Sequence, residues 1–304
     1  MKDELTLQEA VRRSTEHLAG HGLKTPRQDA ELLVLKVTGK DRAFLLSHPE
    51  WKVAPEQQHQ LEQWLEQRRQ HYPIQYLVGS QEFFGRLFRV DPSVLIPRPE
   101  TELIAETGLE LVRTLKKDTV QVLDIGTGSG CIAVTLACED PRIQVAAVDI
   151  SETALDVARE NARCLGCIDR VEFLRGDVLG PLESSGRAFD LIVSNPPYVE
   201  DLSTEVEYSV KTFEPREAVF AGPTGLEIYG RIFRDSRRFL RRPGWLVLEM
   251  GYGIVDRLTD VARGEGWRLL EMRKDLAGIP RCAVFEEVLT DLSKERSRLR
   301  HECS

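Results

Sequence analysis

Between residues 119 and 265 the sequence alternates short apolar runs with longer stretches of helical periodicity, and this alternation restricts the fold more than any other feature. Strands that alternate with helices over short links pair in parallel and form a sheet covered by helices on both faces. The predicted strands are residues 120–124, 144–149, 171–174, 189–194 and 245–250, with two closing strands at 267–273 and 282–289. The predicted helices are residues 130–138, 152–165, 226–240 and 254–265. We therefore expect an α/β fold with a mostly parallel, seven-stranded sheet.

The first 75 residues predict a separate, small N-terminal helical bundle. Thr6 and Glu9 have the spacing of a capping box, which opens a helix. Residues 82–90 have the pattern of two short strands around a turn. We accordingly expect a helical substrate-docking domain at 1–75, a β-hairpin linker at 76–93, a larger domain at 94–290 and a flexible, charged tail at 291–304.

Composition narrows the location and the partners of the chain. Hydrophobic residues make up 41%, but no apolar run approaches the ~20 residues that cross a bilayer. The amino-terminal sequence lacks an apolar signal core and the six cysteines are scattered, so we expect a cytoplasmic protein without a membrane partner. The formal net charge of -8 argues against a stable nucleic-acid partner, because phosphate binding requires clustered Lys and Arg. No histidine spacing suggests a metal site.

A glycine-rich loop follows the first predicted strand and opens a helix, reading Asp-Ile-Gly-Thr-Gly-Ser-Gly over residues 124–130. Glycines at such a turn let a ligand approach the backbone, and the helix start offers free N–H groups. The dinucleotide pattern G-x-G-x-x-G would need glycine at the position of Cys131, and no Gly-Lys-Ser/Thr of a phosphate-binding loop is present. The loop therefore predicts a nucleotide-like ligand of another kind.

Two aspartates stand after the next two predicted strands. Asp149 ends the second strand, where a carboxylate can accept hydrogen bonds from both hydroxyls of a ribose; alternatively it only caps the helix that starts near Ser151. Asp177, followed by Val178, comes after the third strand. It can be interpreted equally well as a ligand-binding residue or as an ordinary turn aspartate.

The most specific motif is Asn195-Pro196-Pro197-Tyr198, directly after the apolar strand 189–194. The prolines remove two backbone donors and stiffen the loop, while neighbouring carbonyls and the Asn195 amide oxygen remain acceptors. An NH2 group held between these acceptors has its nitrogen oriented for attack, and Tyr198 offers a flat face for a planar target. We predict that Asn195, Pro196 and Tyr198 carry the reaction and that all four residues hold the substrate. A plain Pro-Pro turn is the alternative.

The acidic residue followed by G-x-G-x-G is similar to the first motif of class I, Rossmann-like methyltransferases that use S-adenosylmethionine. The resemblance implies that the glycine loop borders the methionine part of this cofactor and that Asp149 binds its ribose. It also implies that an acidic residue near Asp177 faces the adenine, with Val178 as an aliphatic contact where other members carry an aromatic residue. The predicted cofactor ligands are Gly126, Thr127, Gly128, Ser129, Gly130, Asp149, Asp177, Val178 and Asn195.

Further segments narrow the resemblance. LIPRPETE at 95–102, the glycine loop, the Asn-Pro-Pro-Tyr motif, FEPR at 213–216 and KDLAG at 274–278 occur in that order. From about residue 76 to 288 the sequence resembles the peptide-chain release factor glutamine methyltransferase family (PrmC, also called HemK). The resemblance implies transfer of a methyl group to the side-chain N5 of the glutamine in the Gly-Gly-Gln motif of class I release factors. Such a carboxamide is a poor nucleophile, and two acceptors on its NH2 would partly localise the nitrogen lone pair.

Two other functions remain open at this point. A DNA adenine-N6 or RNA guanine-N2 methyltransferase would use the same motif, but such enzymes carry a basic recognition region and flip the base, whereas residues 1–75 are mixed in charge. A non-catalytic scaffold would retain the fold without transferring a methyl group, and the intact motifs argue against it.

Overall fold

The computed structural model describes residues 5–288, which form two compact units. The first unit contains the residues up to Gln81 together with Arg89–Ile96 and Glu205–Pro215. The second contains Glu82–Phe88, Pro97–Thr204 and the residues from Arg216 onward. The predicted charged tail at 291–304 lies outside the described residues.

The first unit is helical. Its helices are α1 (Leu7–Leu18), α2 (Pro26–Thr38), α3 (Arg42–Ser47), α4 (Pro55–Arg69), α5 (Ile74–Val78) and α9 (Tyr208–Phe213). Half of the predicted capping box is confirmed, because the Thr6 hydroxyl accepts from the Glu9 N–H at 3.3 Å, while the Glu9 carboxylate binds Arg12 and Arg13 instead. One apolar core joins the unit, with Leu7, Leu18, Leu33 and Leu61 among its buried side chains. The short helix α5 was not predicted.

Glu205–Pro215 belongs to this helical unit although more than a hundred residues separate it from α5 in the sequence. The Phe213 ring meets the Tyr72 ring edge-on with centroids 5.0 Å apart. The buried carboxylate of Glu214 accepts from the Ile96 N–H at 3.2 Å. Phe213 and Glu214 of the FEPR motif therefore have a structural role within the first unit, which the sequence did not reveal.

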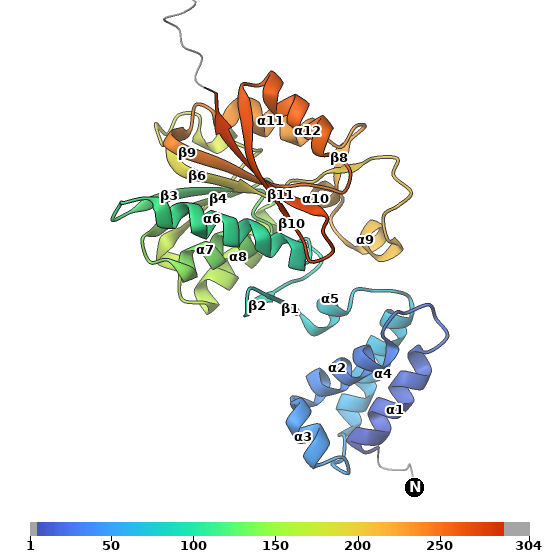
Figure 1. The fold of residues 1–304 in the computed structure, drawn as a ribbon. Helices are drawn as coiled ribbons and strands as arrows, with labels where there is room; N and C mark the ends of the chain where they lie inside the picture. Colours follow the sequence, from blue (N-terminus) through green and yellow to red (C-terminus); the bar gives the residue numbers. More distant parts are fainter. Residues whose placement is uncertain (1–4, 289–304) are drawn as a thin grey trace, which may run out of the picture. The chain divides into compact units, whose positions relative to one another are not determined.

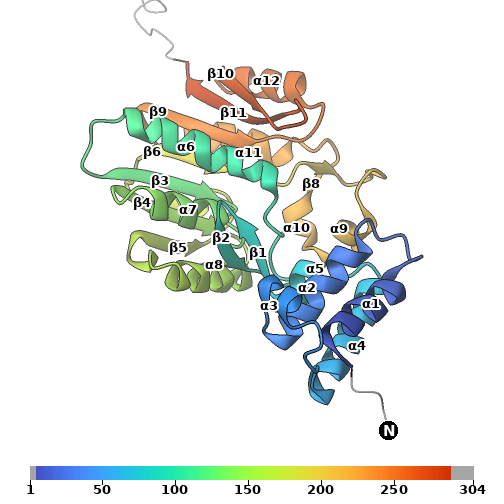
Figure 2. The ribbon, with the colours of Figure 1, turned by 60° about the horizontal axis from the view of Figure 1, so that its bottom comes forward.

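The second unit is built on the predicted seven-stranded sheet, in the order β10-β11-β9-β6-β3-β4-β5 (Figure 2). Neighbouring strands from β9 to β5 pair in parallel, and β11 is antiparallel to both β9 and β10. The strands are β3 (Val120–Ile125), β4 (Ile143–Asp149), β5 (Val171–Arg175), β6 (Phe189–Ser194), β9 (Leu240–Glu249), β10 (Trp267–Lys274) and β11 (Pro280–Glu287). Two small pairs complete the strands: β1 (Ser80–Phe83) with β2 (Arg86–Arg89), and β7 (Val199–Glu200) with β8 (Phe220–Gly222).

Helices cover both faces of the sheet, as the alternation predicts. Figure 1 shows α6 (Glu102–Thr114), α7 (Cys131–Glu139) and α8 (Glu152–Cys164) on one side, and α11 (Glu227–Ser236) and α12 (Val255–Gly264) on the other. The short helix α10 (Arg216–Val219) and the 3-10 turns η1 (Pro99–Thr101), η2 (Ile168–Arg170) and η3 (Gly180–Leu182) lie in the connections. Each face has its own apolar core, because successive side chains of a strand point to opposite faces. No helix among the described residues is long and apolar enough to span a bilayer.

One predicted boundary was wrong. The helix expected to reach residue 240 ends at Ser236, and β9 begins at Leu240 instead of residue 245. The early residues of β9 pair with β6, where Phe189 lies opposite Leu240, and this brings Arg241 to Asp190, which is fully buried and needs a cation. Arg241 at the start of β9 supplies one at 3.0 Å, and Lys117 supplies a second at 2.5 Å.

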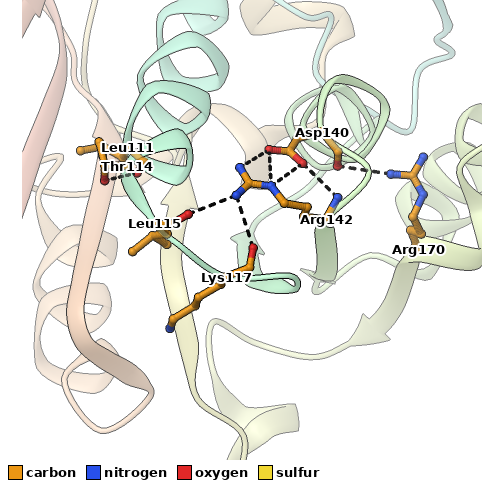
Figure 3. A network of polar contacts seen from close by, with 7 residues as sticks. All are labelled: Leu111, Thr114, Leu115, Lys117, Asp140, Arg142 and Arg170. Carbon is orange, nitrogen blue, oxygen red and sulfur yellow. Dashed lines mark hydrogen bonds and ion pairs between the residues drawn. The ribbon is translucent and has the colours of Figure 1, made fainter.

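The connections at the amino ends of the strands are held by Arg142 (Figure 3). Its guanidinium binds the carboxylate of Asp140 at 2.6 Å and donates to the carbonyls of Leu115 and Lys117 at 3.1 and 3.4 Å. The hydrogen bonds to Arg142 lower the pKa of Asp140. Arg142 therefore ties the α6–β3 connection to the α7–β4 connection, at the opposite end of the strands from their carboxyl ends.

Candidate active site

The functional motifs follow the carboxyl ends of neighbouring parallel strands. β3 pairs with β4 on one side and with β6 on the other, so the chain order reverses direction at β3. Ligands of open α/β sheets bind at this point, outside the carboxyl ends of the strands. The glycine loop follows β3, Asp149 ends β4, and Asn195 follows β6, so the sheet brings these predicted residues together.

The glycine loop lies against β4. The N–H groups of Gly126 and Thr127 both donate to the Val148 carbonyl, at 2.8 and 3.0 Å. Gly126 and Gly128 have φ of 71° and 55°, and open space lies where a Cβ would be. Gly130 has a different role, since a Cβ there would come within 3.0 Å of the Ala158 Cβ. The first two glycines therefore leave room for a ligand, and the third allows α7 and α8 to pack closely.

Asp124, at the base of the loop, is fully buried. Its Oδ2 accepts from the Thr127 hydroxyl at 2.7 Å and from the Ala133 N–H at 3.2 Å. Its Oδ1 has no hydrogen-bond partner among residues 5–288. Burial raises the pKa of Asp124 to about 7, against the two hydrogen bonds that lower it. A buried acceptor without a partner at a ligand loop is consistent with a polar ligand group nearby.

Asp149 accepts two backbone hydrogen bonds at the carboxyl end of β4, and its ribose contact stays a prediction. Its Oδ2 accepts from the Gly128 N–H at 2.8 Å, and its Oδ1 accepts from the Ser151 N–H at 2.9 Å. Ser151 itself caps α8 through the Ala154 N–H. Burial raises the pKa of Asp149. Each carboxylate oxygen retains a free lone pair, so the residue can still accept from two hydroxyls.

Asp177 and Val178 differ sharply in environment. The exposed carboxylate of Asp177 pairs with Arg231 of α11 at 2.7 Å. Val178 is buried and has φ of 51°, a conformation that is strained for a β-branched residue. Its side chain joins the apolar core that also contains Leu179 and Leu182.

The Asn-Pro-Pro-Tyr loop is fixed at both ends. Before it, the Ser194 hydroxyl donates to the Ile125 carbonyl at 2.7 Å, which ties β6 to β3. At its far end, the ring of the half-buried Tyr198 lies so close to Gly251 that a Cβ there would be 2.8 Å from Cδ2. The pKa of Tyr198 is raised by burial and by the charge of Glu249, so its hydroxyl keeps its proton.

Sequence reasoning missed two polar residues that contact this loop. The Asn195 Nδ2 donates to the Thr101 Oγ1 at 3.1 Å, and the Thr101 hydroxyl donates to the Glu249 Oε2 at 2.6 Å. Burial raises the pKa of Glu249 to about 7, although Thr101 and the charge of Arg281 lower it. A glutamate at the end of the apolar run Leu246-Val247-Leu248 was the available signal, because a buried carboxylate needs partners.

Comparison with known proteins decides the family. Residues 9–79 match the PrmC N-terminal domain, and residues 106–221 match the methyltransferase small domain. The chain is 43% identical to the release factor glutamine methyltransferase of Koribacter versatilis, covering 92% of this chain and 98% of that protein. The chain belongs to the release factor glutamine methyltransferase family. Its relative of the same name in Bacillus subtilis is 35% identical, over 93% of this chain and 99% of that protein.

Solved structures confirm the fold of the second unit. A methyltransferase from Pyrococcus furiosus superposes with a TM-score of 0.50 at 16% identity, covering 73% of this chain and all of that chain (100%). The 16S rRNA N2 methyltransferase RsmC of T. thermophilus, solved with AdoMet and guanosine, also has a TM-score of 0.50, at 18% identity over 69% of this chain and 50% of that chain. This chain and these structures share the Rossmann-like methyltransferase fold that the sequence predicts.

Proposed function

We propose that this protein transfers a methyl group from S-adenosylmethionine to the side-chain N5 of the glutamine in the Gly-Gly-Gln motif of class I release factors. One observation carries the proposal: in a member of this family, the Asn195-Pro196-Pro197-Tyr198 loop follows β6 beside the glycine loop of β3. The name of the relatives supplies the release factor and the glutamine.

The residues at the carboxyl ends of β3 and β4 fit the cofactor. S-adenosylmethionine, when bound, supplies an electrophilic methyl group on its sulfonium. Gly126 and Gly128 leave space at the backbone, and the Asp124 Oδ1 is a buried acceptor with no partner in the described part of the chain. Asp149 has lone pairs left for the ribose hydroxyls. Val178 is proposed as the apolar contact of the adenine, with Asp177 at the rim.

The loop after β6 is proposed to hold the glutamine. The Asn195 amide oxygen and the Pro196 carbonyl accept from the two hydrogens of the target NH2, and the ring of Tyr198 lies flat against the carboxamide. Positioning of the target nitrogen then supplies much of the catalysis. Alignment of a nucleophile can lower the activation barrier by several kcal/mol relative to reactants that meet in solution. Tyr198 acts through its surface and not as a base, because its pKa is raised.

Partners and location follow from the same proposal. We assign the helical domain to docking of the release factor, and we propose no stable nucleic-acid partner because the net charge is -8. The five cysteines of the described residues are free thiols, which fits the cytoplasm where release factors act.

The test offers tritiated S-adenosylmethionine to the enzyme with a class I release factor, with its Gln-to-Ala variant, with DNA and with rRNA. We expect label on the release factor alone. Label on nucleic acid, or equal label on the Gln-to-Ala variant, would assign the enzyme to another acceptor. Cofactor binding without transfer to any of the four would identify a scaffold.

A further inference from the structure

Three polar side chains form a hydrogen-bonded relay that begins at the proposed substrate loop and ends in the protein interior. It runs from the Asn195 Nδ2 to the Thr101 Oγ1 over 3.1 Å, and from the Thr101 hydroxyl to the Glu249 Oε2 over 2.6 Å. We propose that Thr101 and Glu249 are positioning residues that turn the Asn195 amide so that its oxygen, and not its nitrogen, faces the target NH2. This inference rests on the proposed function and names residues that serve it.

The direction of the relay follows from the hydrogens available. A threonine hydroxyl has one hydrogen to donate, and the short distance to the Glu249 carboxylate shows where it goes. The Thr101 oxygen therefore presents only lone pairs to Asn195, which must offer its NH2 in return. An asparagine amide is nearly symmetrical in shape, so packing alone would not choose between its oxygen and its nitrogen. Glu249 therefore sets the orientation of the Asn195 amide through two hydrogen bonds, with Thr101 between them.

The choice matters for the reaction. With the nitrogen turned toward the substrate, Asn195 would present donors to the donors of the target NH2, and one of the two acceptors would be lost. With the nitrogen on Thr101, the Asn195 oxygen is left for the target. The relay thus sets which atom of the Asn195 amide faces the target, and the proposed mechanism requires that this atom is the oxygen.

Glu249 is placed to hold its end of the relay firmly. It is only 2% exposed, and its backbone carbonyl accepts from the Tyr229 hydroxyl at 2.7 Å. Its second oxygen, Oε1, lies 3.4 Å from the Tyr198 hydroxyl, so one carboxylate contacts Tyr198 directly and Asn195 through Thr101. With Glu249 ionised, or with a proton on Oε1, Oε2 is still an acceptor and the relay keeps this direction; only a proton on Oε2 would reverse it.

The fold brings together three residues that lie far apart in the sequence. Thr101 ends η1, Asn195 follows β6 and Glu249 ends β9, and all three lie within the second unit. Parallel pairing of β6 with β9 brings two of them to the same edge of the sheet. The prolines before Thr101 fix the approach of the third.

A double-mutant cycle tests the relay, using Thr101→Val, Glu249→Met and the double variant. Thr101→Val removes the acceptor, and Glu249→Met frees the threonine hydrogen to turn toward Asn195. We expect each to lower kcat by roughly 10-fold to 10²-fold, with cofactor Kd within about 2-fold of wild type. The kcat of the double variant should be no lower than that of the less active single variant, because both changes break the same relay. Multiplying losses would contradict the relay, as would full activity in Thr101→Val.

Two controls separate positioning from folding. Thr101→Ser keeps the hydroxyl and should restore kcat to within about 3-fold of wild type. Thr107→Val makes the same change at a second buried threonine, in α6, whose hydroxyl contacts the Cys282 thiol, and should leave kcat unchanged. A loss in Thr107→Val equal to that in Thr101→Val would show that only packing is being measured.

A spectroscopic readout keeps the relay testable apart from the substrate. In asparagine-selective ¹⁵N labelling, the side-chain NH2 signal of Asn195 is assigned by its loss in Asn195→Ala. We expect it to be slowly exchanging in wild type and Thr101→Ser, and fast or broadened in Thr101→Val. An unchanged signal in Thr101→Val would overturn the relay. A wild-type enzyme that labels no release factor would instead overturn the proposed function, while this readout would still decide the relay.

Discussion

The backbone N–H of Gly128 donates to the carboxylate of Asp149 across 2.8 Å, which links the loop after β3 directly to the end of β4. The carboxylate therefore holds the glycine loop in addition to the ribose contact that we propose for it. Replacing it should affect the shape of the loop and the ligand contact together.

Asp149→Ala is accordingly expected to weaken S-adenosylmethionine binding by roughly 10²-fold, since a charge-assisted acceptor and a loop contact are lost together. Isothermal titration calorimetry measures the change. Glu172→Ala on β5 is a suitable control, because that exposed carboxylate pairs with Arg187 at 2.5 Å and its loss should leave the affinity unchanged. Unchanged affinity in Asp149→Ala would remove the ribose role.

Asn195→Ala should lower turnover by roughly 10²-fold or more, because a single positioned polar group in an active site commonly contributes that much. Steady-state methylation of the release factor, with cofactor affinity measured in parallel, checks the prediction. A variant with near-normal activity would rule out the proposed role of the amide oxygen.

Stability should depend on pH through the two carboxyl groups whose pKa burial raises to about 7, Asp124 and Glu249. Because their pKa values are higher in the folded than in the unfolded state, their stabilising effect is complete below about pH 4 and is lost as the pH rises to 7. The two pKa shifts each correspond to a loss of stability on the order of 3–4 kcal/mol.

Urea denaturation of the cofactor-free protein between pH 5 and 8 measures this dependence. Asp124→Asn should flatten the decline with pH, because an amide does not titrate. A decline equally steep in wild type and Asp124→Asn would show that other groups cause it. Carboxylates with lowered pKa values, such as Asp140, act in the opposite sense and only in more acidic solution.

The sequence predicted the sheet, and the loops that carry the proposed site, because both depend on local signals. Apolar runs such as the one before Asn195 identify strands, and glycines or prolines after them identify loops that meet at one edge of a parallel sheet. Thr101 and Glu249 were missed because their roles arise from contacts between distant segments. The early start of β9 was missed for the same reason, since Arg241 there neutralises the buried Asp190 of another strand.

Arg142→Ala should lower the free energy of unfolding measurably while leaving kcat unchanged, because its partners lie at the amino ends of the strands. Chemical denaturation gives the free energy of unfolding, and the methylation assay gives kcat. Arg113→Ala, at an exposed position in the last turn of α6, should change stability by less than about 0.5 kcal/mol. A matching loss in both variants would indicate a general effect of removing positive charge.

Gly251→Ala should lower kcat by roughly 10-fold through Tyr198 alone. The new Cβ would lie 2.8 Å from the Tyr198 Cδ2 and 3.2 Å from its Cε2, so the ring must move from the position proposed for the glutamine. Gly264→Ala is the matched control, because nothing lies within 4 Å of its Cβ position at the end of α12. We expect Gly251→Ala to retain cofactor affinity, since Tyr198 is not a proposed cofactor ligand. Normal turnover in this variant would mean that the exact position of the tyrosine ring does not matter to the reaction.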